Sequence, residues 1–168
     1  MTARPIATVP PGCHRVTPWI IVKGAASMVA FIERVFGGKE KEGSRVMNPD
    51  GTIGHVEVLL GDSAVMLFDR KDNWIATPAF LRIYVESVAD TVARATEAGG
   101  TVVTEPTPLF FGEKVGRLRD PWGNLWWVHE RVEELDWSEM EERMRDPEAQ
   151  RNMAYVQQSL DEALRKSP

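Results

Sequence analysis

Two stretches of the chain share one succession of apolar and polar positions. Residues 17–38 begin as a strand through Val22 and continue with apolar positions at helical spacing, and residues 80–100 do the same through Val85. The helical positions are Met28, Phe31, Ile32 and Val35 in the first stretch and Val88, Val92 and Ala95 in the second. Both predicted helices end at a glycine pair, a common C-terminal stop. Val85 follows Val22 by 63 positions and Gly100 follows Gly38 by 62, which indicates an internal repeat with one gap.

Each predicted helix is followed by three short strands. The expected ranges are 44–48, 53–60 and 63–69 in the first half and 101–104, 114–119 and 124–130 in the second. The polar segment 69–79 joins the halves. We therefore predict an α+β fold of two βαβββ modules, about 14–69 and 79–130, within one domain that spans residues 1–130. The alternative is a ferredoxin-like or other α+β domain whose symmetry is accidental.

The single helix of each module can cover only one face of that module's sheet. The other face must be buried against another element or bind a ligand. We expect the two modules to pair into a curved, cup-shaped sheet whose concave face suits a ligand. The side chains that enter this cup follow from strand alternation.

The segment GHVEVLLGDSAVMLFD, residues 54–69, predicts a tight hairpin. If Gly61 and Asp62 form a two-residue loop, Leu60 pairs with Ser63 and Glu57 pairs with Met66. Alternation then gives an apolar face for the helix, made of Val56, Val58, Val65 and Leu67. The cup-facing side is made of His55, Glu57, Leu59, Ala64, Met66 and Phe68. The same alternation predicts in the cup Thr17, Trp19, Ile21, Phe80, Arg82, Tyr84, Leu125, Trp127 and His129.

Composition narrows the function classes. The 20 Lys and Arg residues against 25 Asp and Glu give a net charge of −5, and no basic run is present, so we expect no nucleic-acid partner. The single cysteine, Cys13, excludes an internal disulfide and favours a reducing, cytoplasmic compartment. No apolar run approaches membrane-spanning length, so we expect no membrane partner.

The duplicated unit resembles the vicinal oxygen chelate superfamily, which includes glyoxalase I, bleomycin-resistance proteins and extradiol dioxygenases. The segments that carry the resemblance are the hairpin above, LRIYVESVADTVARA, and FFGEKVGRLRDPWGNLWWV, and they are similar to the PhnB-like branch of glyoxalase/bleomycin-resistance proteins. The resemblance runs in order over residues 13–144. It implies the cup-shaped fold and a homodimer, but one scaffold of this kind hosts several chemistries.

The resemblance also implies where a metal would bind. The positions that correspond to the four usual ligands hold Thr17, Met66, Phe80 and Trp127. None is a usual ligand for a divalent ion, so we expect no metal and no cofactor. The alternative is a relocated divalent ion at His55, Glu57 and His129, which would support a lyase, isomerase or dioxygenase.

The expected cup contains polar and aromatic candidates for ligand contact. His55 and Glu57 are the candidates for catalysis, and Glu57 could instead accept hydrogen bonds from His55, Arg82 or Tyr84 in a buried polar cluster. The candidates for ligand binding are Trp19, Met66, Phe68, Arg82, Tyr84, Phe110, Trp127 and His129. Rings stack planar ligands, although each ring alone could simply fill the core. Arg82 could pair with Glu57 or an anionic ligand, or point to solvent.

Phe110 and Phe111 precede Gly112 in a segment that is unfavourable for a simple hairpin turn. We expect a flap over the mouth of the cup, with a dimer contact as the alternative.

Residues 131–168 predict a helical extension. Ser138 is the expected cap of a short helix with Met140 and Met144 on one stripe. A second helix carries Tyr155, Val156, Leu160 and Leu164 at helical spacing, so it should dock on the body or on a second subunit.

Three functions fit these patterns. The first is a small-molecule-binding protein of the glyoxalase/bleomycin-resistance type, whose partner is a small organic ligand. The second is the metal-dependent enzyme described above. The third is a dimerising scaffold without a ligand.

Overall fold

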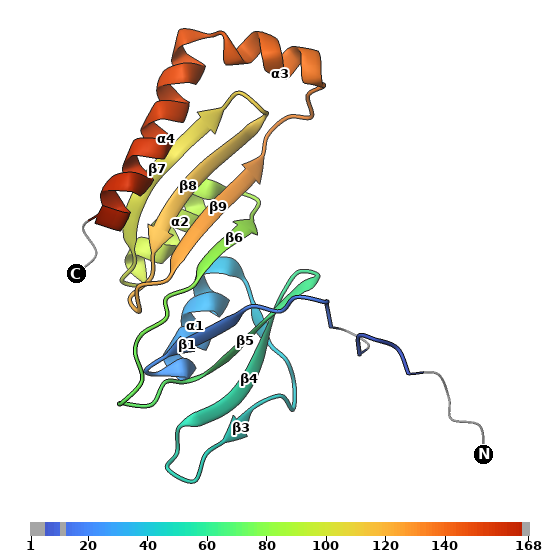
Figure 1. The fold of residues 1–168 in the computed structure, drawn as a ribbon, viewed down its shortest axis with the longest axis vertical. Coiled ribbons are helices and arrows are strands. Elements are labelled where there is room, and N and C mark those ends of the chain that lie inside the picture. Colours follow the sequence, from blue (N-terminus) through green and yellow to red (C-terminus); the bar gives the residue numbers. More distant parts are fainter. Residues whose placement is uncertain (1–5, 11–12, 166–168) are drawn as a thin grey trace. The chain divides into compact units, whose positions relative to one another are not determined.

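The computed structural model describes residues 6–10 and 13–165 and divides at Thr77 and Pro78 into two compact units, here called unit one and unit two (Figure 1). None of the helices in these ranges combines the length and apolar character needed to cross a membrane.

The described residues of unit one form one helix and five strands. They are β1 (Trp19–Val22), α1 (Ala25–Phe36), β2 (Lys39–Glu40), β3 (Val46–Met47), β4 (Ile53–Leu60) and β5 (Ser63–Asp69). The strand order is β1-β5-β4-β2, with β3 also paired to β4, and β1 runs parallel to β5. The hairpin register is the predicted one, because Leu60 pairs with Ser63 and Glu57 with Met66.

The core of unit one lies between α1 and one face of this sheet. The buried strand residues are Ile20, Val22, Ile53, Val56, Val58, Val65 and Leu67, and the buried helix residues are Ala25, Met28, Val29, Phe31, Ile32 and Val35. The predicted apolar face of the hairpin is therefore confirmed.

The Asp69 carboxylate organises the start of α1. One oxygen accepts from the backbone N–H groups of Gly24 at 2.7 Å and Ala25 at 2.9 Å, and the other accepts from Ile53 N at 2.7 Å. Gly24 has a left-handed backbone with φ of 85° and supplies no side chain to cap the helix. A side chain 45 residues away thus satisfies N–H groups that α1 leaves free.

Unit two repeats this topology and adds the tail. Its elements are β6 (Phe80–Tyr84), α2 (Val88–Glu97), β7 (Thr101–Leu109), β8 (Glu113–Arg119), β9 (Leu125–Arg131), α3 (Trp137–Met144) and α4 (Pro147–Arg165). The strand order is β6-β9-β8-β7, with β6 parallel to β9. The predicted repeat of a strand, a helix and a following sheet is thus confirmed, and β2 is a short strand that the prediction did not include.

Strand β7 is longer than the expected range of 101–104. It continues through Pro106 and Pro108 to Leu109, and it is the last strand in the sheet order. Prolines are tolerated there because an edge strand does not need every N–H for pairing. Phe110 and Phe111 consequently form the turn into β8, with ring centroids 5.2 Å apart.

The two faces of the unit-two sheet are covered by different helices. Gly116 faces α2, where an added Cβ would lie 2.9 Å from Val88 Cγ1. The next residue, Arg117, points the other way and donates to Val156 O on α4. Figure 1 shows α4 alongside β7. The tail therefore docks on its own unit.

The cap of α3 differs from the prediction. Asp136, not Ser138, accepts from Glu139 N at 2.9 Å, and the Glu139 carboxylate accepts from Asp136 N at 2.8 Å. This reciprocal capping box makes Asp136 the cap, two residues before the expected Ser138. Both residues are good caps, and each is followed three positions later by a Glu, Glu139 or Glu141, so the sequence alone does not distinguish them.

The turn at Asp120 contains a buried polar cluster that its composition did not reveal. Asp120 is 4% exposed, and its carboxylate accepts from Trp122 N, from Asn124 N and Nδ2, and from Trp126 Nε1. The Asn124 Oδ1 atom in turn accepts from Ala79 N at 2.8 Å. This cluster ties the β8–β9 turn to the start of β6.

We predict that Asp120→Ala lowers the free energy of unfolding by about 2–4 kcal/mol, because several buried donors lose their acceptor together. Urea denaturation followed by circular dichroism measures the change. Asp50→Ala is the matched control, since Asp50 accepts only from Thr52 in an exposed turn. Equal small losses in both variants would contradict the structural role of Asp120.

Candidate functional site

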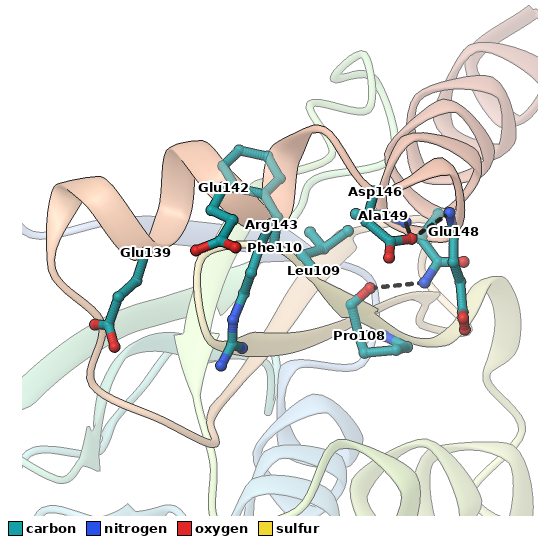
Figure 2. Close-up of a pocket in the computed structure, with 10 residues that line it drawn as sticks. Pro108, Leu109, Phe110, Glu139, Glu142, Arg143, Asp146, Glu148 and Ala149 are labelled. Carbon is teal, nitrogen blue, oxygen red and sulfur yellow. Dashed lines mark hydrogen bonds between the residues drawn. The ribbon is translucent and has the colours of Figure 1, made fainter.

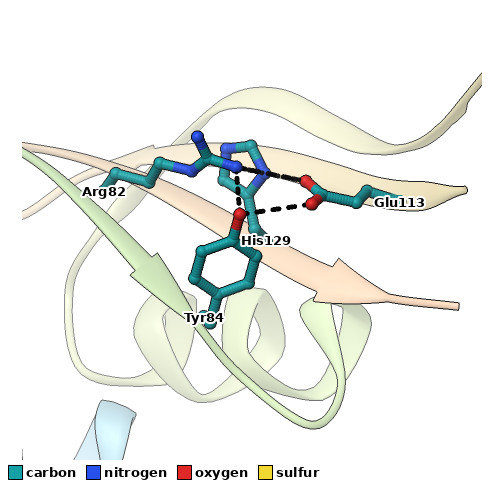
Figure 3. A network of polar contacts seen from close by, with 4 residues as sticks. All are labelled: Arg82, Tyr84, Glu113 and His129. Atoms are coloured by element: carbon teal, nitrogen blue, oxygen red, sulfur yellow. Dashed lines mark hydrogen bonds and ion pairs between the residues drawn. The ribbon is translucent and has the colours of Figure 1, made fainter. Parts of the chain in front are cut away.

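The face of the unit-two sheet opposite α2 carries a network of four polar side chains. Arg82 and Tyr84 come from β6, Glu113 begins β8, and His129 lies on β9 (Figure 3). Strand register brings them together because Tyr84 pairs with His129, and Glu113 lies two residues before the Val115 that pairs with His129 on the other side.

Glu113 is the common acceptor of this network. Its Oε2 atom lies 2.6 Å from His129 Nδ1 and 3.3 Å from Arg82 Nη2, and its Oε1 accepts from the Tyr84 hydroxyl at 3.2 Å. Arg82 also contacts the Tyr84 hydroxyl. One carboxylate therefore orients an imidazole, a phenol and a guanidinium.

The protonation of His129 follows from these partners. A carboxylate only accepts and a guanidinium only donates, so the Nδ1 proton is shared with Glu113, and the Arg82 Nη2 atom 3.2 Å from Nδ1 cannot bond to it. His129 is 1% exposed, and burial lowers the pKa of its imidazole, although Glu113 opposes the shift. The neutral ring then has a bare Nε2 atom, which is buried and has no hydrogen-bond partner within residues 6–10 and 13–165.

Trp127 lies among cations on the same face. Its ring centroid is 4.3 Å from the guanidinium carbon of Arg117, 5.9 Å from that of Arg82, and 4.7 Å from the His129 ring centroid. Such distances are typical of cation–π contacts. The Trp127 Nε1 atom is buried and has no hydrogen-bond partner among the described residues.

Unit one carries a second polar and aromatic group on the face opposite α1. The Lys41 ammonium lies 2.7 Å from Glu57 Oε2, and His55 Nε2 lies 3.6 Å from Glu57 Oε1. Lys41 holds the pKa of the Glu57 carboxyl below its ordinary value. Trp19 contacts His55 and Phe68 edge-on, at centroid distances of 5.6 Å and 5.3 Å.

Sequence reasoning found part of these two groups. It placed Trp19, His55, Glu57, Met66 and Phe68 together, and they do lie on neighbouring strands of unit one. Arg82, Tyr84, Trp127 and His129 lie together in unit two.

Sequence reasoning missed Lys41, Glu113 and Arg117. Glu57 was expected to accept from His55, Arg82 or Tyr84. His55 does lie beside it, with Nε2 3.6 Å from Oε1, but the closest cation is Lys41. Arg82 and Tyr84 bind Glu113 instead. Alternation along Glu113, Val115 and Arg117, applied against β9, would have identified the two missed residues of β8.

A groove with a volume of about 590 Å³ lies between the β7–β8 turn and the C-terminal helices (Figure 2). Its lining is Pro108, Leu109, Phe110, Glu139, Glu142, Arg143, Asp146, Glu148, Ala149 and Asn152. Arg143 forms two hydrogen bonds with Glu133, and Asn152 Nδ2 donates to Pro108 O. Phe110 thus lines this groove, while Phe111 packs against the buried cluster of Leu109, Val115 and Val156.

The donor chemistry does not fit the metal site of the resembled superfamily. The corresponding positions, Thr17, Met66, Phe80 and Trp127, provide no imidazole, carboxylate or thiolate. Across residues 6–10 and 13–165, no three His, Cys, Asp or Glu side chains are grouped so as to hold an ion. The alternative ion at His55, Glu57 and His129 draws on both units and stays a prediction.

The family follows from comparison with known proteins. A model of the Glyoxalase/Bleomycin resistance protein/Dioxygenase superfamily matches residues 12–128. The chain belongs to this superfamily. The resemblance inferred from the hairpin and the repeat is thereby confirmed.

Two mycobacterial proteins are similar in sequence to most of the chain. The uncharacterized proteins Mb0911c of Mycobacterium bovis and Rv0887c of Mycobacterium tuberculosis are each 29% identical over 139 residues, which is 76% of this chain and 90% and 81% of theirs.

Solved structures of this superfamily fold are similar to the chain at lower identity. TioX from Micromonospora sp. ML1 has a TM-score of 0.55 at 21% identity, over 73% of this chain and all of its own. A PhnB protein from Bacillus cereus has a TM-score of 0.56 at 20% identity, over 68% and 98%. The fosfomycin resistance protein FosX of Listeria monocytogenes, in a complex with Mn(II) and a dihydroxypropylphosphonic acid, has a TM-score of 0.53 at 15% identity, over 67% and 88%. These likenesses establish the fold.

We predict that His129 makes stability depend on pH. Burial lowers the pKa of His129 in the folded protein. At pH values between this lowered pKa and the ordinary pKa of the unfolded chain, the imidazole is protonated in the unfolded chain but not in the folded one. The free energy of unfolding should therefore rise with pH across that window, and this contribution to stability should be lost as pH falls from the ordinary histidine pKa towards the lowered one. His129→Gln should flatten this slope by up to about 1.4 kcal/mol per pH unit, measured by urea unfolding from about pH 5 to about pH 7.5.

The exposed His14, which contacts the Asp62 carbonyl, provides the control for this measurement. His14→Gln should keep the slope of the unchanged protein. A slope that persists in His129→Gln would contradict the assignment of the buried neutral imidazole.

Proposed function

We propose that the protein binds a small organic molecule through the polar and aromatic face of unit two. The observation that carries the proposal is the Glu113 network beside two buried atoms without partners, Trp127 Nε1 and His129 Nε2. Buried polar groups normally have partners, so atoms of this kind favour an additional molecule at the site. The indole N–H would donate to that molecule, and the imidazole nitrogen would accept from it.

Aromatic rings support a planar ligand. Tyr84 is 53% exposed, and its ring lies 5.4 Å from that of His129, while Trp127 is half-buried beside it. In unit one, Trp19 is 43% exposed beside His55, Phe68 and Met66. We propose that each aromatic group contacts a ligand on its own unit. Exposed rings next to oriented polar groups combine stacking with directional hydrogen bonds.

We propose that this binding needs no metal, since the positions of the usual ligands hold side chains that divalent ions do not use. The Listeria FosX complex contains Mn(II) together with its phosphonic acid. Binding that persists in a chelator would distinguish this chain from a metal-dependent relative. A homodimer and a cytoplasmic location remain predictions of the sequence.

A second candidate function is proton transfer, and the Glu113–His129 pair favours it. A carboxylate that holds the Nδ1 proton leaves Nε2 as the basic atom and stabilises the imidazolium that forms after proton uptake. A bound molecule with an acidic C–H bond could then lose a proton to His129. His55 and Glu57, the catalytic candidates from sequence, would need their own test, because Glu57 is already paired with Lys41.

Ligand binding is tested by thermal unfolding against a set of small planar molecules. A ligand at about 100 times its Kd stabilises by about 2.7 kcal/mol, which raises Tm by several degrees. We expect the shift to survive EDTA and to be lost in Trp127→Leu. Trp137→Leu is the control, because Trp137 is exposed on α3. A shift that EDTA abolishes, or one that Trp127→Leu retains, would contradict the proposed site.

Proton transfer is tested by exchange with heavy water. If His129 acts as the base, molecules that raise Tm and contain an acidic C–H bond should incorporate deuterium at that carbon, detected by NMR. His129→Gln should abolish the exchange, and Glu113→Gln should slow it about 10-fold or more, because the imidazolium loses its carboxylate. Exchange that is unchanged in His129→Gln would eliminate this candidate and leave the binding function intact.

A further inference from the structure

Arg117 is a buried cation without a carboxylate partner. Its side chain is 3% exposed, and Nη1 donates to Val156 O at 2.6 Å and to Thr104 Oγ1 at 3.2 Å. In the part of the chain that the structure describes, Nε has no hydrogen-bond partner. Within the described ranges, no Asp or Glu forms an ion pair with it. Burying a charge is costly unless it is paired, so this guanidinium is incompletely compensated.

The charges around Arg117 leave a surplus of positive charge on this face. Glu113 is shared by Arg82 and the neutral His129, so two guanidiniums face one carboxylate. The charged side chains of the covering helix, Glu148, Arg151, Asp161, Glu162 and Arg165, are all exposed. Glu105 on β7 is exposed as well. An anion at Arg117 would neutralise a charge that the protein itself does not neutralise.

Helix α4 buries few of its own side chains over this cation. Of its 19 residues, Val156 and Ser159 are buried, and Met153 packs against the cluster of Leu109, Val115 and Val156. Hydrogen bonds supplement this small apolar contact: Ser159 with Thr104, Glu105 N to the Tyr155 hydroxyl, and Arg119 to Ala163 O. An element with little buried apolar surface opens locally at low cost compared with global unfolding.

We propose that Arg117 is the anion-binding residue of the ligand site and that α4 is a displaceable cover over it. A carboxylate or phosphate group of the ligand binds the guanidinium side-on, with one oxygen on the Nε donor and the other on Nη2, which is the paired geometry that Nε can form. Helix α4, which is attached to Nη1 through Val156 O, moves aside to admit the ligand. Trp127 Nε1 supplies a further donor beside the ligand's planar part. This inference rests on the proposed binding function and specifies its ligand class as small aromatic anions.

The test measures Kd by titration calorimetry on the full chain with phenyl phosphate, benzoate and the neutral benzyl alcohol. We expect the two anions to bind at least 10-fold more tightly than the alcohol. Arg117→Met should reduce the affinity for the two anions to the affinity for the alcohol. Arg119→Met is the control, because Arg119 lies on the same strand and also donates to α4, and it should leave the affinity for the anions unchanged. Equal anion affinities in Arg117→Met and the unchanged protein would overturn the inference.

The cover is tested independently. Phenyl phosphate should accelerate hydrogen–deuterium exchange over residues 156–164, because α4 has to move away from Arg117 to admit the anion. Val156→Ala should tighten anion binding about fivefold, since a larger fraction of molecules is open before binding. If Arg117→Met does not fold, Arg117→Lys replaces it and should lose affinity for phenyl phosphate about 10-fold, because lysine cannot form the paired contact. Unchanged exchange together with unchanged affinity in Val156→Ala would refute the cover.

The outcomes separate the two proposals. If benzyl alcohol and the anions bind equally and Arg117→Met changes neither, the binding function stands and the anion site is wrong. If no planar molecule of either charge binds, both proposals are contradicted.

Discussion

The Glu113 carboxylate is the interaction on which the polar face of unit two depends. It accepts from donors on two other strands, so the positions of β6 and β9 relative to β8 determine whether the network exists. It also fixes which nitrogen of His129 carries the proton. The binding proposal and the proton-transfer alternative both require that tautomer, because each uses the bare Nε2 atom.

The unit-two sheet has helices on both faces, and the two coverings differ in kind. Towards α2 the contacts are apolar and close, as at Gly116, where a side chain would collide with Val88. Towards α4, hydrogen bonds to Arg117, Thr104 and Arg119 accompany a small apolar cluster of Leu109, Val115 and Val156. The covering by α2 is mainly apolar, whereas the covering by α4 includes polar contacts that other polar partners can replace. The added tail therefore occupies the face that carries the candidate site.

The fold could be predicted from the sequence because the hairpin loop and the strand and helix periodicities each lie within a short segment of the chain. The hairpin register follows from one two-residue loop, and the repeat follows from periodicity. The missed residues depend on partners far along the chain. Glu113 matters because of His129 and Arg82, and Asp120 because its carboxylate meets Trp126 inside a turn that composition alone makes unremarkable. Lys41 follows β2, a strand of two residues that is too short to be predicted from an alternating pattern.

Asp69 connects three separate segments of unit one through one side chain. The end of β5, the beginning of α1 and the first residue of β4 meet at a single carboxylate. Rupture at this point would free three amides at once, in segments that are distant in the chain. Unit one should therefore lose its helix and its central hairpin in one cooperative step, with no stage in which α1 detaches while the strands persist.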